Sequence, residues 1–189
     1  IKNLGIIGGG QLGSLLAVAA KKLNINTIIY CDDLDAPAQN FCNKFIHGKY
    51  DDKIKMQEFI NEIDVITYEF ENIPYETLNE MNKVKPVLPK PSVNRLIQHR
   101  IAEKDFVNKL NIRTTRYASI ESKSDMEPLG DFLPGILKTT TMGYDGKGQY
   151  PIKKIEDINN LNIDFSKGYI LEKLVKLKKE ISVIITRFG

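Results

Sequence analysis

The sequence predicts an α/β fold, in which a doubly wound parallel sheet is followed by an α+β arrangement. Three observations carry this prediction. Short apolar runs alternate with helical patterns through residues 1–90, a glycine-rich turn joins the first run to the first helix, and strand patterns dominate the second half of the chain. We therefore expect two domains, at residues 1–90 and 91–189.

The elements of the first domain alternate along the chain. Apolar runs predict strands at residues 4–7, 27–30, 45–47, 65–68 and 87–88, and apolar residues at helical spacing predict helices at 12–23, 54–63 and 74–83. Pro74 suits the start of the third helix, because the first turn leaves its N–H groups unpaired. Strands that alternate with helices favour a parallel sheet with helices on both faces.

The second domain follows a different pattern. A helical stretch begins at Ser92, a suitable N-cap, and continues to about residue 110 with an apolar stripe at helical spacing. Strands are predicted at 116–120, 135–138, 149–153, 169–174 and 181–187, with a short helix at 155–161. Such a combination is typical of α+β domains.

Composition and charge exclude several classes of protein. The formal net charge of +3, from 27 basic and 24 acidic residues, is too balanced to indicate a nucleic-acid partner. No apolar stretch is long enough to span a membrane, and the two cysteines form no C-x-x-C pair that would indicate structural zinc. We expect a cytoplasmic protein whose sequence continues beyond Gly189, because it stops directly after an apolar run.

The opening glycine motif leaves two interpretations. Gly8, Gly10 and Gly13 have the G-x-G-x-x-G spacing of a dinucleotide-binding turn, and Asp32 or Asp33 follows the second strand where such proteins carry a ribose-binding acid. These features permit an NAD-dependent oxidoreductase. A tight strand-to-helix turn without any cofactor would use the same three glycines.

Two later stretches are suited to a nucleotide. Lys138 ends a strand before a loop rich in glycine and threonine, which is able to fold over a polyphosphate, although it would also serve as a plain exposed hairpin. The strand around Glu172 leads to Val175, whose backbone edge would suit adenine, and Glu180 would suit ribose hydroxyls. The alternative is a solvent-facing hairpin, as is usual for charge runs.

Five motifs together resemble a known family. They are "GGGQLG" at 8–13, "DAPA" at 35–38, "YEFENIP" at 68–74, "KTTTMGYDGKGQ" at 138–149, and "EKLV" at 172–175 followed by Glu180. This set resembles the ATP-grasp superfamily and, within it, the 5-(carboxyamino)imidazole ribonucleotide synthetases, over essentially the whole chain. The resemblance implies a pre-ATP-grasp domain followed by an ATP-grasp domain that is incomplete in this chain. It also implies a homodimer that uses ATP and Mg²⁺, with the metal ligands beyond Gly189.

The resemblance assigns roles to individual residues. It implies that ATP is bound by Arg100, Lys138, Gly143, Tyr144, Asp145, Gly146, Lys147, Gly148, Gln149, Glu172, Lys173, Leu174, Val175 and Glu180. It implies that the ribonucleotide is bound by Gly10, Gln11, Leu12, Glu69, Glu71, Tyr144, Asp145 and Lys147, and that Asp145, Tyr144 and Lys147 act in catalysis. In this interpretation the glycine turn faces the ribonucleotide, and Asp32 and Asp33 are turn or surface residues.

The implied reaction is an ATP-dependent carboxylation. Bicarbonate is phosphorylated to carboxyphosphate, whose carboxyl group passes to the amine of aminoimidazole ribonucleotide, and a closing loop protects the intermediate from water. Three alternatives stay open. They are another ATP-grasp ribonucleotide ligase, such as a formate-dependent glycinamide ribonucleotide transformylase, the NAD-dependent oxidoreductase, and a noncatalytic nucleotide-binding module.

Overall fold

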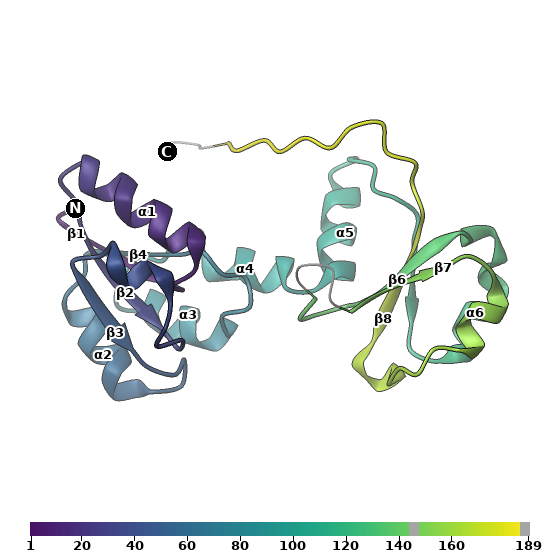
Figure 1. Cartoon of the computed structure of the whole chain (residues 1–189), viewed down its shortest axis with the longest axis horizontal. Helices are drawn as coiled ribbons and strands as arrows, with labels where there is room; N and C mark the ends of the chain where they lie inside the picture. Colours follow the sequence, from purple (N-terminus) through teal and green to yellow (C-terminus); the bar gives the residue numbers. More distant parts are fainter. Residues whose placement is uncertain (144–147, 186–189) are drawn as a thin grey trace. The chain divides into compact units, whose positions relative to one another are not determined.

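A computed structural model describes residues 1–143 and 148–185 of the chain. The chain divides into two compact units, Ile1–His99 and Arg100–Gly189, which are described separately (Figure 1). The expected domain border at residue 90 precedes α4 (Pro91–Ile97), which packs against α3 (Tyr75–Asn82) in the first unit. In the part of the chain that the structure describes, no helix has the length and apolar character needed to cross a membrane.

The first unit is built on a four-stranded parallel sheet in the order β3-β2-β1-β4. The strands are β1 (Asn3–Ile7), β2 (Asn26–Cys31), β3 (Lys44–His47) and β4 (Val65–Tyr68), and Val87 adds a parallel bridge to Ile66. The other elements are α1 (Gln11–Lys22), α2 (Lys53–Asn61) and the 3-10 helix η1 (Pro37–Asn40). The predicted parallel sheet is confirmed, with element ends that differ by one or two residues.

Apolar side chains cover both faces of this sheet, as its alternating strands require. On one face Ile6 and Ile29 are fully buried with Ala17 of α1. On the other face Ile7 and Tyr30 of neighbouring strands belong to a larger cluster that includes α2 and α3. Helices therefore lie on both faces, which confirms the doubly wound arrangement (Figure 1).

The second unit contains a four-stranded antiparallel sheet in the order β5-β8-β6-β7. Its strands are β5 (Tyr117–Ile120), β6 (Gly135–Thr139), β7 (Gln149–Ile152) and β8 (Tyr169–Lys173). Its helices are α5 (Arg100–Lys109), α6 (Ile155–Asn159) and the 3-10 segments η2 (Lys123–Phe132) and η3 (Phe165–Lys167). One sheet face carries Leu137 and Leu171 into a core with Met126 of η2 and Ile158 of α6. The α+β prediction is confirmed.

Two local predictions are wrong. The helix expected from Ser92 to residue 110 is two helices, and the first begins at Pro91 after the N-cap Lys90, so Ser92 lies inside it. The strand expected at 181–187 is absent from its described part, residues 181–185, which has no regular structure. A strand needs a neighbour to satisfy its backbone groups, and no described strand pairs with this segment.

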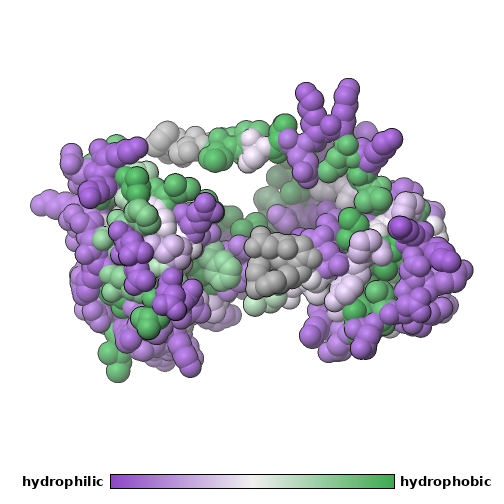
Figure 2. Space-filling view, in the orientation of Figure 1, coloured by the Kyte–Doolittle hydropathy of each residue, from purple (hydrophilic) through white to green (hydrophobic). Residues whose placement is uncertain are grey.

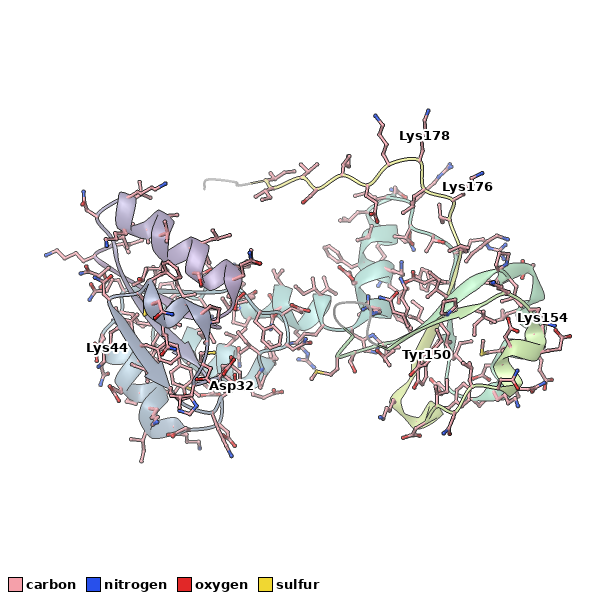
Figure 3. All side chains as sticks on the ribbon, viewed as in Figure 1. Asp32, Lys44, Tyr150, Lys154, Lys176 and Lys178 are labelled. Carbon is pink, nitrogen blue, oxygen red and sulfur yellow. The ribbon has the colours of Figure 1, made fainter. Side chains whose placement is uncertain are left out.

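The segment from Leu174 to Ile185 is instead extended and exposed. Ile181, Val183 and Ile184 expose 85%, 70% and 93% of their surface, so their apolar character stabilises no contact here. Figure 2 shows hydrophobic and hydrophilic surfaces next to each other along this segment, and Figure 3 shows Lys176 and Lys178 directed away from the chain. Both lysines are exposed, as is usual for a charge run that faces solvent.

Candidate nucleotide and ribonucleotide sites

The first candidate site lies at the carboxyl end of the parallel sheet. From β1 the chain continues to β2 on one side, whereas β4 lies on the other side of β1. Connections that diverge in this way leave a crevice above the two strands, where doubly wound proteins bind ligands. The glycine turn follows β1 and Glu69 follows β4, so the fold brings these two motifs of the sequence together.

The glycine turn is closed on the side chain of Glu69. The N–H of Gly10, the N-cap of α1, donates to Oε1 of Glu69 at 2.9 Å. Gly8 has a φ of +99°, and a Cβ placed on it would lie 2.6 Å from the same carboxylate oxygen. The glycines therefore let the backbone lie close to the Glu69 carboxylate, as the tight-turn interpretation requires.

This internal carboxylate disfavours a dinucleotide. A pyrophosphate bound at the start of α1 would need the N–H groups and the positive end of the helix dipole. Glu69 already occupies that position with a negative charge and would repel it. Asp33 accepts a hydrogen bond from the N–H of Asp35 at 2.9 Å, so the turn role expected for Asp33 is confirmed.

Gly8 provides a stability prediction. Gly8→Ala is expected to lower the free energy of unfolding by about 1–3 kcal/mol, because alanine is strained at positive φ and its methyl group would meet Glu69. Urea unfolding measures the change. Gly130→Ala is the matched control, because no atom lies within 4 Å of a Cβ built at Gly130. Equal stability of the two variants would contradict the close approach.

Three further residues of the expected ribonucleotide site lie on the surface. Gln11 and Leu12 begin α1 and are exposed beside the turn. Glu71 is exposed, and its carbonyl accepts a hydrogen bond from Gln98 at 2.7 Å. Tyr50 was not singled out in the sequence, yet burial and the nearby groups of Cys31, Asp32 and Glu69 raise the pKa of its hydroxyl. Tyr50 belongs to no local motif, and it reaches the crevice only because the loop after β3 places it near these groups.

The second candidate site lies on the α5 side of the antiparallel sheet. The carboxylate of Glu172 on β8 binds two lysines: Lys138 Nζ lies 2.7 Å from Oε2, and Lys104 Nζ lies 3.2 Å from Oε1. The three side chains expose only 11%, 18% and 17% of their surface, respectively. One buried carboxylate with two cations gives the group a net charge of +1, which suits an anionic ligand.

The charge of Glu172 depends on these lysines. Burial acts to raise the pKa of Glu172, but the hydrogen bond from Lys138 and the charge of Lys104 outweigh it and hold the pKa below its ordinary value. A lowered pKa stabilises the folded state above the ordinary value of 4.5, and this stabilisation is lost as pH falls through the lowered pKa.

The pH dependence of stability tests this pairing. We expect Glu172→Gln to flatten the loss of stability as pH falls from about 5 to about 3, because the variant has no carboxylate to protonate. Urea unfolding midpoints across that range check it. Glu127→Gln is the control, since Glu127 is an exposed glutamate on η2 of the same unit. An unchanged pH profile in Glu172→Gln would contradict the pairing.

Arg100 fixes the base of the glycine-rich loop. Its Nε donates to the carbonyl of Thr139 at 3.1 Å, and its Nη2 donates to the carbonyl of Gly143 at 2.8 Å. At the far end, Gly148 has a φ of +68°, and its carbonyl accepts from Thr139 N–H. The structure thus brings Arg100, Gly143 and Gly148 together with Lys138 and Gln149, which are paired in β6 and β7. Tyr144, Asp145, Gly146 and Lys147 lie outside the described residues.

The chain after Glu172 offers a backbone edge. The N–H groups of Lys173 and Leu174 donate to the carbonyls of Arg116 and Pro134, both at 2.9 Å. The carbonyl of Lys173 accepts from Thr115 Oγ1 at 2.7 Å. In residues 1–143 and 148–185, no acceptor is found for the N–H of Val175. Glu180 lies farther along the exposed segment and is not brought beside these groups.

Comparison with known proteins decides the family. The ribonucleotide synthetase preATP-grasp domain matches residues 1–98, more than half of the chain. The chain belongs to this family. The ATP-grasp domain matches residues 105–189, so the preATP-grasp domain is followed by ATP-grasp sequence, as the resemblance implied.

Two curated relatives and one solved structure are similar to the chain over nearly its whole length. The chain is 36% identical, over 98% of its length, to the N5-carboxyaminoimidazole ribonucleotide synthase of Brucella melitensis and covers 52% of that protein. It is also 36% identical to the bifunctional purine synthesis protein purC/E of Dictyostelium discoideum, of which it covers 19%. The structure of N5-carboxyaminoimidazole synthetase from Staphylococcus aureus with ADP matches with a TM-score of 0.85 and 31% identity, covering 94% of this chain and 48% of that one. The chain therefore spans about half the length of these single-activity relatives.

Proposed function

We propose that this chain forms the preATP-grasp domain and part of the ATP-grasp domain of an enzyme that carboxylates 5-aminoimidazole ribonucleotide. The reaction would use ATP and bicarbonate and give 5-(carboxyamino)imidazole ribonucleotide, ADP and phosphate in purine biosynthesis. The observation that carries this proposal is the 36% identity to N5-carboxyaminoimidazole ribonucleotide synthase across 98% of the chain.

The second unit supplies groups that fit a purine nucleoside triphosphate. The N–H of Val175, for which the described residues offer no acceptor, would donate to a ring nitrogen of adenine beside the Glu172–Leu174 backbone, and Glu180 would accept from ribose hydroxyls. Lys138 and Arg100 would contact the phosphates, because ammonium and guanidinium groups form strong charge-assisted hydrogen bonds with them. The loop at residues 143–149 would cover these phosphates.

The first unit would hold the ribonucleotide. Gly10 and Glu69 already share a hydrogen bond in the crevice, with Gln11 and Leu12 exposed next to them. Glu69 would accept from an amine or hydroxyl of the ribonucleotide rather than contact its phosphate, since two anions repel each other. Glu71 would need to turn its exposed side chain toward the same ligand.

The chain would position the reactants and take up one proton. An oxygen of bicarbonate would displace ADP from the γ-phosphorus, and carboxyphosphate would release phosphate as its carboxyl carbon bonds to the ribonucleotide amine. Asp145 would accept the proton that leaves the amine, with Tyr144 and Lys147 contacting both ligands. Closure of the loop would exclude the water that destroys carboxyphosphate.

Mg²⁺, homodimer formation and a cytoplasmic location stay predictions. Across residues 1–143 and 148–185, no three His, Cys, Asp or Glu side chains are placed so that they could hold a metal ion. Since Mg²⁺ prefers several oxygen ligands, these residues do not fit a metal site by themselves, and no step is assigned to the metal.

Release of ADP by the full-length protein tests the proposed function. We expect ADP release to reach its full rate only when both bicarbonate and 5-aminoimidazole ribonucleotide are present. Formate with glycinamide ribonucleotide is the matched substrate pair, because it would support the formate-dependent transformylase instead. Release that depends on this second pair, or on neither pair, would contradict the proposal.

A further inference from the structure

Lys104 is a charged residue that no motif in the sequence singled out. It extends from α5 to the carboxylate of Glu172, on the oxygen that Lys138 leaves free. Tyr117 pairs with Glu172 across β5 and β8, and its ring centroid lies 5.7 Å from Lys104 Nζ. The carboxylate and the aromatic ring thus hold the lysine between them.

The contact with Glu172 limits what Lys138 can do. In the structure Lys138 Nζ donates to this carboxylate at 2.7 Å, so any phosphate must compete with Glu172 for the same ammonium group. Glu172 as a whole residue is 8% exposed, and a buried carboxylate that loses its cation is strongly destabilised. A second cation on the other oxygen removes most of that cost, because the carboxylate stays paired.

We propose that Lys104 is a positioning residue that keeps Glu172 paired, so that Lys138 is free to bind the phosphates of a nucleotide. The inference rests on the proposed function, because it requires that this face binds ATP. Lys104 acts through Glu172 and does not itself need to contact the phosphates. Its removal leaves one carboxylate and one lysine, whose charges cancel and whose contact excludes a competing anion.

The proposal predicts a phosphate-specific defect. Lys104→Met is expected to weaken ATP binding about tenfold, in the range of one charge-assisted hydrogen bond, while adenosine binding stays unchanged because adenosine has no phosphate. Lys104→Arg keeps the cation and is expected to retain most of the ATP affinity. Adding Glu172→Gln to Lys104→Met removes the carboxylate that holds Lys138, so the ratio of ATP affinity to adenosine affinity is expected to recover.

Calorimetry with ATP and with adenosine on the full-length protein tests this. The readout is the ratio of the two affinities, which general damage to the site would not change. Lys109→Met, an exposed lysine at the end of α5, is the matched control. The single Glu172→Gln variant provides an independent measurement, with a ratio equal to or above that of the wild type.

The outcomes separate the two proposals. An unchanged ratio in Lys104→Met, a ratio that stays low in the double variant, or a lowered ratio in Glu172→Gln alone would overturn the role of Lys104 while leaving ATP binding intact. Absence of ATP binding by the wild-type protein would instead overturn the proposed function and, with it, this inference.

Discussion

Asp145→Asn is expected to lower the kcat of bicarbonate-dependent ADP release by about 10²- to 10⁴-fold, the usual contribution of a positioned general base. Asparagine has almost the same shape as aspartate but does not take up the proton that leaves the ribonucleotide amine. The amide keeps the size and one acceptor oxygen of the carboxylate, so the loss in kcat should exceed any change in the affinity for ATP. Steady-state kinetics and calorimetry on the full-length protein measure both quantities.

The control for Asp145 is an aspartate outside both candidate sites. Asp51→Asn changes an exposed carboxylate in the loop before α2 and should leave kcat unchanged. A kcat within about threefold of the wild type in Asp145→Asn would exclude proton transfer by this residue, since general bases contribute far more.

Lys138→Met is expected to weaken ATP binding about 10- to 100-fold, because it removes a charge-assisted contact to phosphate. Glu172 keeps Lys104 at 3.2 Å, so the second unit should remain folded. The variant therefore separates the loss of a ligand contact from the loss of structure. Calorimetry gives the affinity, and circular dichroism checks the fold.

Lys153→Met is the matched control, since Lys153 is an exposed lysine just after β7 on the same sheet. It should bind ATP like the wild type. Equal ATP affinity in Lys138→Met and Lys153→Met would remove Lys138 from the phosphate site.

The sheet of the first unit was predictable because its signals are local. Runs such as residues 4–7 and 65–68 are apolar on both faces, as buried parallel strands require, and they fall within one residue of β1 and β4. The break between α4 and α5 was not predictable from periodicity, since Ile97 and Ile101 keep helical spacing across the polar residues 98 and 99. Spacing alone does not show whether a stripe finds a partner, and α5 has no buried residue.

The sites were predictable only where a motif names the residue. Lys138 and Glu172 belong to motifs and lie together on the sheet. Lys104 and Tyr50 belong to no motif, because their roles depend on contacts between elements far apart in the sequence. The contact between Gly10 and Glu69 joins two motifs in a way that the sequence did not specify, and it disfavours a dinucleotide.

Titration of the full-length wild-type protein with ATP and, separately, with NAD tests the central claim most directly. The claim is that the sheet face with Lys138 and Lys104 binds a nucleoside triphosphate. The claim is also that the Glu69 carboxylate, which is hydrogen-bonded to the glycine turn, keeps a dinucleotide out. We predict saturable binding of ATP, competition by ADP, and no heat with NAD. Binding of NAD without binding of ATP would contradict the account.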